Sequence, residues 1–170
     1  MRDISGERRF RAGLVQLRSG RSVKPNLDKA EELIRRAAKG GAIYVQTPEN
    51  TGLMELKPEL VLEAAETEER SAALAQLRAL ARELGIFLHI GSLAIKLDPS
   101  RVANRSYLIG PEGQVAARYD KLHMFDVDLP GGESYRVSSH CRLGSQAVVV
   151  HLSFGRLGLS ICYALRFPQL

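Results

Sequence analysis

The residue best suited to nucleophilic chemistry is Cys162, within the segment GRLGLSICYALRFP at residues 155–168. Leu157, Leu159 and Ile161 alternate with smaller or polar residues, which predicts a half-buried strand that ends beside the cysteine. The following residues predict a sharp turn into a short helical piece, which would place free backbone N–H groups next to the sulfur. Such groups lower the pKa of a thiol and can stabilise an oxyanion. The same pattern also fits a small buried hydrophobic residue at the end of a strand.

Three stretches of the chain resemble, in order and at plausible spacing, the motifs of the nitrilase superfamily, the carbon–nitrogen hydrolases. Residues 158–168 (GLSICYALRFP) resemble the nucleophile segment of that family. Residues 47–50 (TPEN) resemble its glutamate motif, and residues 118–126 (RYDKLHMFD) resemble its lysine motif. The resemblance extends from about residue 11 to residue 170, so nearly the whole chain takes part.

The resemblance implies a Glu–Lys–Cys triad made of Glu49, Lys121 and Cys162. Cys162 would attack the carbon of an amide or nitrile, and Glu49 would take the thiol proton, donate to the leaving amine and then activate water. Lys121 would stay cationic and stabilise the oxyanion together with the backbone N–H of Tyr163. The implied reaction converts a small amide to a carboxylic acid and ammonia through a cysteine thioester. It needs no metal and no organic cofactor.

Two positions depart from the family pattern. Ala164 stands where the family usually has an aspartate, and Val137 stands where relatives commonly have a second, pocket-lining glutamate. Family members also continue well beyond the cysteine motif, so this chain resembles the N-terminal part of such a domain, incomplete at its C-terminus. The alternative hypothesis is therefore a truncated, catalytically impaired protein with at most an interaction role.

The predicted elements explain how residues so distant in sequence would meet. Apolar periodicity predicts an α/β fold with strands at residues 11–17, 42–46 and 86–95, helices at 26–39, 58–66 and 68–84, and hairpins at 104–119 and 147–161. Asn26 is the predicted cap of the first helix. The resemblance sharpens this fold to an α-β-β-α sandwich. Each triad residue falls at or just after the C-terminal end of a predicted strand, where open α/β sheets bind ligands.

Length and composition limit the possible domain organisation and cellular compartment. A flexible segment at residues 1–10 and one domain at 11–170 fit the length of 170 residues. The sequence has no apolar run long enough to span a membrane and no secretory signal. Two distant cysteines predict a reducing cytoplasm rather than a disulfide framework.

The charge pattern bears on possible partners. The net charge of +5 comes from basic residues interleaved with acidic ones, which disfavours a nucleic-acid-binding module. His140 and Cys141 are adjacent rather than spaced as metal ligands, so no metal site is predicted. The expected partner is a small amide substrate, and the resemblance implies a homo-oligomer.

Overall fold

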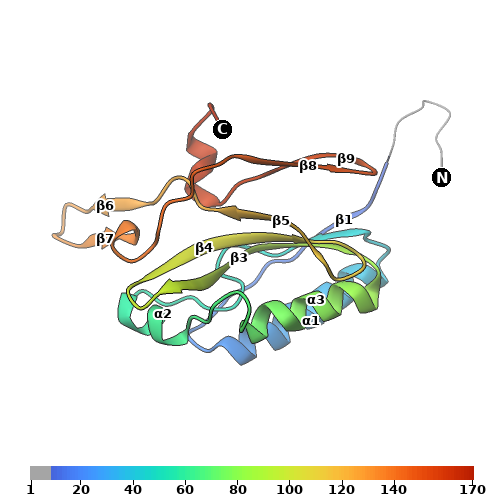
Figure 1. Cartoon of the computed structure of the whole chain (residues 1–170), viewed down its shortest axis with the longest axis horizontal. Coiled ribbons are helices and arrows are strands. Elements are labelled where there is room, and N and C mark those ends of the chain that lie inside the picture. The colour runs from blue at the N-terminus through green and yellow to red at the C-terminus, as the bar shows by residue number, and fades with distance from the viewer. Residues whose placement is uncertain (1–8) are drawn as a thin grey trace.

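The computed structural model describes residues 9–170 and places them around one mixed β-sheet (Figure 1). The sheet has five strands in the order β1-β2-β3-β4-β5: β1 (Ala12–Leu14), β2 (Tyr44–Gln46), β3 (Phe87–Asp98), β4 (Arg101–Ile109) and β5 (Val115–Asp120). The first three strands pair in parallel, and β3, β4 and β5 pair antiparallel. This confirms the predicted α/β class.

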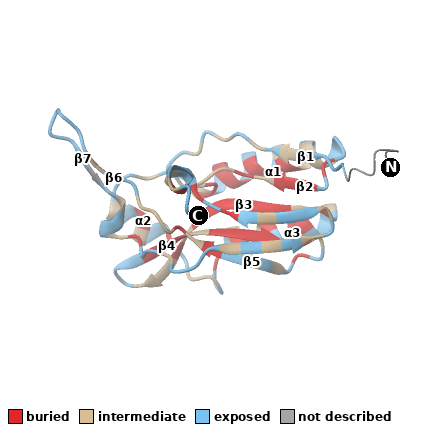
Figure 2. Cartoon of the chain, turned by 90° about the horizontal axis from the view of Figure 1, so that it is seen from above, coloured by how far each residue is buried: buried red, intermediate tan, exposed pale blue. Residues whose placement is uncertain are grey.

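Helices α1 (Val23–Lys39) and α3 (Ala72–Leu84) lie side by side along one face of the sheet, and α2 (Pro58–Ala64) lies near one end (Figure 1). The buried residues form a core between these two long helices and strands β2, β3 and β4 (Figure 2). Ile34 of α1, Leu77 of α3 and Leu88 of β3 are fully buried there. None of the helices within residues 9–170 is both long enough and apolar enough to cross a membrane.

Both long helices begin at residues that differ from the sequence prediction. Asn26 does not cap α1, which already begins at Val23. The buried Asn26 side chain instead contacts the backbone of Gly20 and donates 2.9 Å to the carbonyl oxygen of Gly52. It is one turn inside the helix, so its amide reaches a neighbouring loop rather than the first helical N–H groups.

Helix α3 begins at Ala72 rather than at the predicted residue 68, because the side chain of Ser71 caps the helix there. The Ser71 hydroxyl accepts a 3.2 Å hydrogen bond from the backbone N–H of Leu74. Gly85 ends the helix in the left-handed conformation, at φ 64°. Glu68 is therefore outside the helix, where its side chain is available to the sheet.

Glu68 takes part in an ion cluster on one face of the β4–β5 pair. Arg105 lies opposite Asp120 in the register and contacts its two carboxylate oxygens at 2.6 and 2.9 Å. The same guanidinium donates 2.8 Å to Glu68, which also accepts from Arg118 and from the Tyr107 hydroxyl. Because successive side chains of a strand point to opposite faces, the neighbours of Arg105 and Asp120 point to the other face.

A second layer lies beside β5 on the side away from the helices (Figure 1). Strands β8 (Val148–Leu152) and β9 (Gly155–Leu159) form the predicted hairpin. Leu159 and Ile161 bury their side chains against Tyr119 of β5. The 3-10 helix η2 (Cys162–Arg166) follows, as the predicted short helical piece.

The segment between β5 and β8 has more structure than its sequence predicted. Strands β6 (Asp126–Asp128) and β7 (Ser134–Arg136) form a short antiparallel hairpin, and the 3-10 helix η1 (Val137–Ser139) follows. At the other end of the chain, most of the predicted flexible segment lies outside the described residues. Phe10 is described, and its ring lies 4.3 Å from that of Phe154.

Gly91 allows the turn after β2 to lie directly on β3. A Cβ atom at this position would be 2.3 Å from the carbonyl oxygen of Thr47 and 2.3 Å from the carbonyl carbon of Pro48. Both atoms are backbone, so they cannot move aside by a change of rotamer. Only glycine permits this close approach, and the turn carries Glu49.

We expect Gly91→Ala to lower the free energy of unfolding by about 1–3 kcal/mol, the range for overpacking a closely packed site. Gly158→Ala is the matched control, because a Cβ atom at Gly158 would meet nothing within 4 Å. Urea unfolding of both variants measures the difference. Equal stabilities for the two variants would contradict the close packing of this turn.

Candidate active site

Glu49 lies in a turn that β3 holds in place. The backbone N–H of Thr47 donates to the carbonyl oxygen of His89 at 3.0 Å, and that of Thr51 donates to the carbonyl oxygen of Ser92 at 3.0 Å. Asn50 has a φ of 56°, a conformation that asparagine tolerates better than most residues. The turn is thereby fixed on both sides of Glu49, which comes shortly after the last residue of β2, Gln46.

Lys121 follows the last residue of β5 and is buried, with 3% of its surface exposed. Its backbone N–H donates 3.0 Å to the carbonyl oxygen of Asn104, and its own carbonyl accepts 2.9 Å from the N–H of Gly144. A Cβ atom at Gly144 would be 2.2 Å from the carbonyl oxygen of Asp120, so this approach also requires glycine. The backbone of Lys121 is therefore held from two sides.

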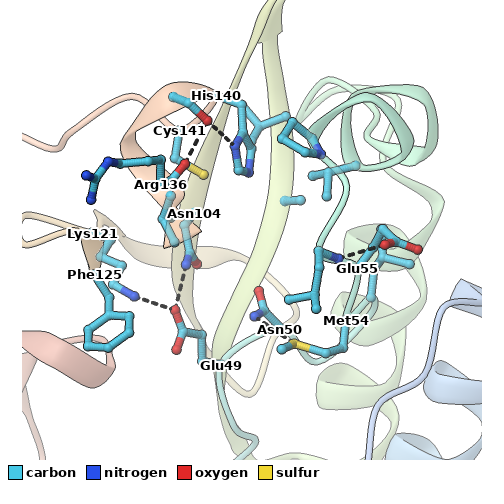
Figure 3. Close-up of a pocket in the computed structure, with 18 of the residues that line it drawn as sticks. Glu49, Asn50, Met54, Glu55, Asn104, Lys121, Phe125, Arg136, His140 and Cys141 are labelled. Atoms are coloured by element: carbon cyan, nitrogen blue, oxygen red, sulfur yellow. Dashed lines mark hydrogen bonds and ion pairs between the residues drawn. The ribbon is translucent and has the colours of Figure 1, made fainter. Parts of the chain in front are cut away.

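The ammonium group of Lys121 and the carboxylate of Glu49 form an ion pair, with Nζ 2.7 Å from Oε1 (Figure 3). The Asn104 side chain donates to the same oxygen at 2.7 Å. Burial of either charge alone would be costly, and the pair with its additional hydrogen bond offsets that cost. Two of the three predicted triad residues are therefore in direct contact.

Cys162 begins η2 and has a φ of 46°, which is unusual for a residue other than glycine. The turn is closed by the backbone, because the N–H of Ala164 donates 3.1 Å to the carbonyl oxygen of Ile161. Ala164 itself is buried. The turn thus forms without the aspartate that the family pattern has at this position.

The thiol of Cys162 belongs to the same site as the ion pair. Burial raises its pKa, and the negative charge of Glu49 together with a hydrogen bond to that carboxylate raises it further. Lys121 and the backbone N–H of Tyr163 act in the opposite direction and lower the thiol pKa. The net pKa is above the ordinary value, so the resting sulfur is a protonated thiol. The three predicted triad residues therefore converge.

Aromatic contacts join the segment after Lys121 to the turn that carries Cys162. His123 stacks on Phe167, with ring centroids 3.6 Å apart and planes 10° apart. Phe125 meets Tyr163 edge to face at 5.4 Å, within the favourable range for aromatic pairs. Because these residues follow the lysine and the cysteine closely in sequence, their contacts restrict how far the two can separate.

The site opens into a pocket of about 590 Å³ (Figure 3). Glu49, Lys121 and Cys162 all line this pocket. Val137, the second departure from the family pattern, also lines it and packs against the buried cluster of Val61, Ala65, Val102 and Cys141. One wall is therefore apolar where the family pattern has a second carboxylate. Within residues 9–170, no group of three or more His, Cys, Asp or Glu residues is placed to bind a metal ion.

The sequence prediction did not identify two residues of the site. Asn104 contacts Glu49, and its position could be found from the β4–β5 hairpin, whose register brings Asn104 next to Lys121. Cys141 lines the pocket, and burial raises the pKa of its thiol to about 11. No local motif marks Cys141, because its segment reaches the site only by pairing with Val102.

The model of the carbon–nitrogen hydrolase family matches residues 11–170, and the chain belongs to that family. It is 35% identical over 165 residues to the deaminated glutathione amidase of Synechocystis, covering 95% of this chain and 60% of the relative. It is 31% identical over 163 residues to human omega-amidase NIT2, with 95% and 57% covered.

Solved structures show the same fold. The Caenorhabditis elegans NitFhit protein matches with a TM-score of 0.85 and 31% identity, over 94% of this chain and 39% of that one. The amidase of Nesterenkonia sp. AN1 matches with a TM-score of 0.78 and 27% identity, over 95% and 60%. The chain thus spans about three fifths or less of the length of these relatives.

The two charges beside Cys162 should move its reactivity in opposite directions. Glu49→Gln removes the negative charge, so we expect a lower thiol pKa and faster alkylation by iodoacetamide at neutral pH. Lys121→Met removes the positive charge, so we expect a higher pKa and slower alkylation. Each pKa unit changes the thiolate fraction by about tenfold. Peptide mapping by mass spectrometry separates Cys162 from Cys141. A change of the same sign in both variants would contradict the arrangement.

Proposed function

We propose that this chain hydrolyses the C–N bond of a small primary amide, releasing a carboxylic acid and ammonia through a thioester on Cys162. The observation that carries this proposal is the convergence of a thiol, a carboxylate and a buried ammonium group, with Lys121 Nζ 2.7 Å from Glu49 Oε1. Family membership supports the same reaction class. The naming of relatives as deaminated glutathione amidase and omega-amidase supports small ω-amides as substrates.

The raised pKa of Cys162 determines how the first step proceeds. Since the resting sulfur is protonated, attack on the amide carbon requires a base, and Glu49 lines the same pocket as that sulfur. As the S–C bond forms, the thiol proton passes to Glu49 and the carbonyl oxygen becomes an oxyanion. The ammonium of Lys121 and the backbone N–H of Tyr163 are the donors beside the sulfur that would stabilise that charge.

The second half of the cycle uses the same groups in reverse. Glu49 returns its proton to the nitrogen, the C–N bond breaks and ammonia leaves the thioester. Water then attacks the thioester carbon and gives a proton to Glu49. Collapse of this second tetrahedral intermediate breaks the C–S bond, and the sulfur takes back the proton from Glu49. The acid is released and every group regains its starting state.

Two further properties belong to this proposal. We place the protein in a reducing compartment such as the cytoplasm, because Cys141 and Cys162 both carry free thiols. We also propose that it associates with copies of itself, on the family resemblance. Light scattering on the purified chain would test the second point, and a strictly monomeric mass would contradict it.

We expect Cys162→Ser to abolish ammonia release from small ω-amides, because a hydroxyl lacks the nucleophilicity of sulfur. We expect Lys121→Met to lower kcat by roughly 10²–10³, the loss typical of one oxyanion donor. Lys39→Met is the matched control, because Lys39 is exposed at the end of α1.

A trapping experiment tests the thioester itself. Added hydroxylamine should yield a hydroxamate from the thioester. Ammonia release that survives in Cys162→Ser would refute the cysteine mechanism.

The same assay tests the alternative of a catalytically impaired chain. A wild-type protein that is folded, reacts with iodoacetamide at Cys162 and yet releases no ammonia from any ω-amide would favour that alternative. Alkylation of Cys162 that responds to neither Glu49→Gln nor Lys121→Met would mean that the site itself is not formed. The two measurements therefore distinguish an incomplete substrate pocket from an incomplete triad.

A further inference from the structure

Asn104, on β4, contacts the carboxylate of the proposed active site. The residue is buried, with 7% of its surface exposed, and its Nδ2 donates a 2.7 Å hydrogen bond to Oε1 of Glu49. Lys121 Nζ contacts that same oxygen at 2.7 Å from another side (Figure 3). Both contacts are to Oε1, so the second carboxylate oxygen, Oε2, is bonded by neither donor.

The other end of the Asn104 amide shows which contact determines its orientation. Within the described part of the chain, Asn104 Oδ1 is buried and has no hydrogen-bond partner. Leaving a buried carbonyl unpaired lowers stability, whereas an apolar residue of the same shape would avoid that cost. Turning the amide over would bring its oxygen against the Glu49 carboxylate. The benefit of an amide at this position therefore lies in its contact with Glu49.

The backbone of Asn104 holds the lysine as well. Its carbonyl oxygen accepts a 3.0 Å hydrogen bond from the N–H of Lys121. The next residue, Arg105, contacts both oxygens of Asp120 on the opposite face of the same strand pair. Asn104 is therefore on a rigid strand and is fixed relative to both charges of the ion pair.

We propose that Asn104 is a positioning residue that orients the carboxylate of Glu49 for proton exchange with Cys162. The proposal rests on the function proposed above. With Lys121 and Asn104 on Oε1, the free lone pairs of Oε2 are the ones available to accept a proton. The amide also supplies a neutral donor, which stabilises the carboxylate without adding a second positive charge beside the sulfur.

A test of Asn104 must separate its effect from the effects of the other groups near Glu49. Lys121 forms an ion pair with Glu49. The thiol pKa values of Cys162 and Cys141 both respond to the charges of Glu49 and Lys121. Removing the Asn104 donor leaves the Glu49 charge less compensated, which disfavours the thiolate of Cys162. The effect of Asn104 on the sulfur should therefore pass through Glu49.

A double-mutant cycle on thiol reactivity tests this without requiring turnover. The rate of Cys162 alkylation by iodoacetamide is measured against pH for the wild type, Asn104→Leu, Glu49→Gln and the double variant. We expect Asn104→Leu to move the profile to higher pH and to slow alkylation several-fold at neutral pH. In the Glu49→Gln background, Asn104→Leu should leave the profile unmoved. An equal shift in both backgrounds, or none in either, would overturn the proposal.

Two more variants keep the result interpretable. Ser106→Ala is the matched control, because it removes buried hydrogen bonds to His89 and to the carbonyl oxygen of Ile90 from the same strand without touching Glu49. It should lower the melting temperature and leave the profile in place. Asn104→Asp keeps the shape if Asn104→Leu does not fold, and its added carboxyl should move the profile further toward high pH. An unmoved profile in a folded Asn104→Asp would also overturn the proposal.

Turnover supplies a second readout. On a small ω-amide we expect Asn104→Leu to lower kcat by roughly 10²-fold, the low end of the contribution of a positioned general acid–base. KM should stay unchanged, since the amide does not bind substrate in this role. If the wild type itself releases no ammonia, the proposed function fails, and the alkylation cycle still decides the role of Asn104. A raised KM with unchanged kcat would assign Asn104 to substrate binding instead.

Discussion

The site depends on one carboxylate oxygen, Oε1 of the half-buried Glu49. An ammonium group and an amide both contact it at 2.7 Å, and together they offset the cost of burying the charge. Glu49 comes after the end of β2. Asn104 is on β4, and Lys121 comes directly after the end of β5. Strand β3 lies between them in the sheet, so the ion pair forms only when the strands pair in their observed register.

The ion cluster on the opposite face of the hairpin secures that register. Arg105 lies opposite Asp120, and a slip by one residue would exchange the faces of Asn104, Arg105 and their neighbours. Glu68 adds to this cluster, and contacts to Arg118, Arg105 and Tyr107 hold its pKa below the ordinary value in spite of burial. The charges on one face therefore specify the geometry of the charges on the other.

The sequence predicts the elements of this fold well where the signal is local, and less well where partners are distant. Apolar periodicity located the central strands and the end of α3. The predicted cap at Asn26 was wrong because its amide bonds a loop that only the tertiary fold brings near. The predicted start of α3 at residue 68 was wrong because helical propensity does not reveal that Glu68 serves the ion cluster.

In the candidate site too, residues marked by a local motif were predicted, and a residue placed by long-range pairing was not. Motif resemblance predicted Glu49, Lys121 and Cys162, and the structure brings these three side chains together. Their catalytic roles remain a prediction. Asn104 was missed because its importance follows from strand register rather than from a motif, and hairpin register is set by pairing across the sheet.

The protonated resting state of Cys162 has a consequence for selectivity. A preformed thiolate would react with many electrophiles, whereas a protonated thiol in the same pocket as Glu49 loses its proton only as it attacks. Lys121 supplies positive charge beside the sulfur, but Glu49 already neutralises much of that charge in the resting state. Once Glu49 accepts the thiol proton it becomes neutral, and the Lys121 charge becomes available to the developing oxyanion. Proton transfer and oxyanion stabilisation are therefore coupled through the one ion pair, which concentrates the stabilisation in the transition state rather than in the resting enzyme.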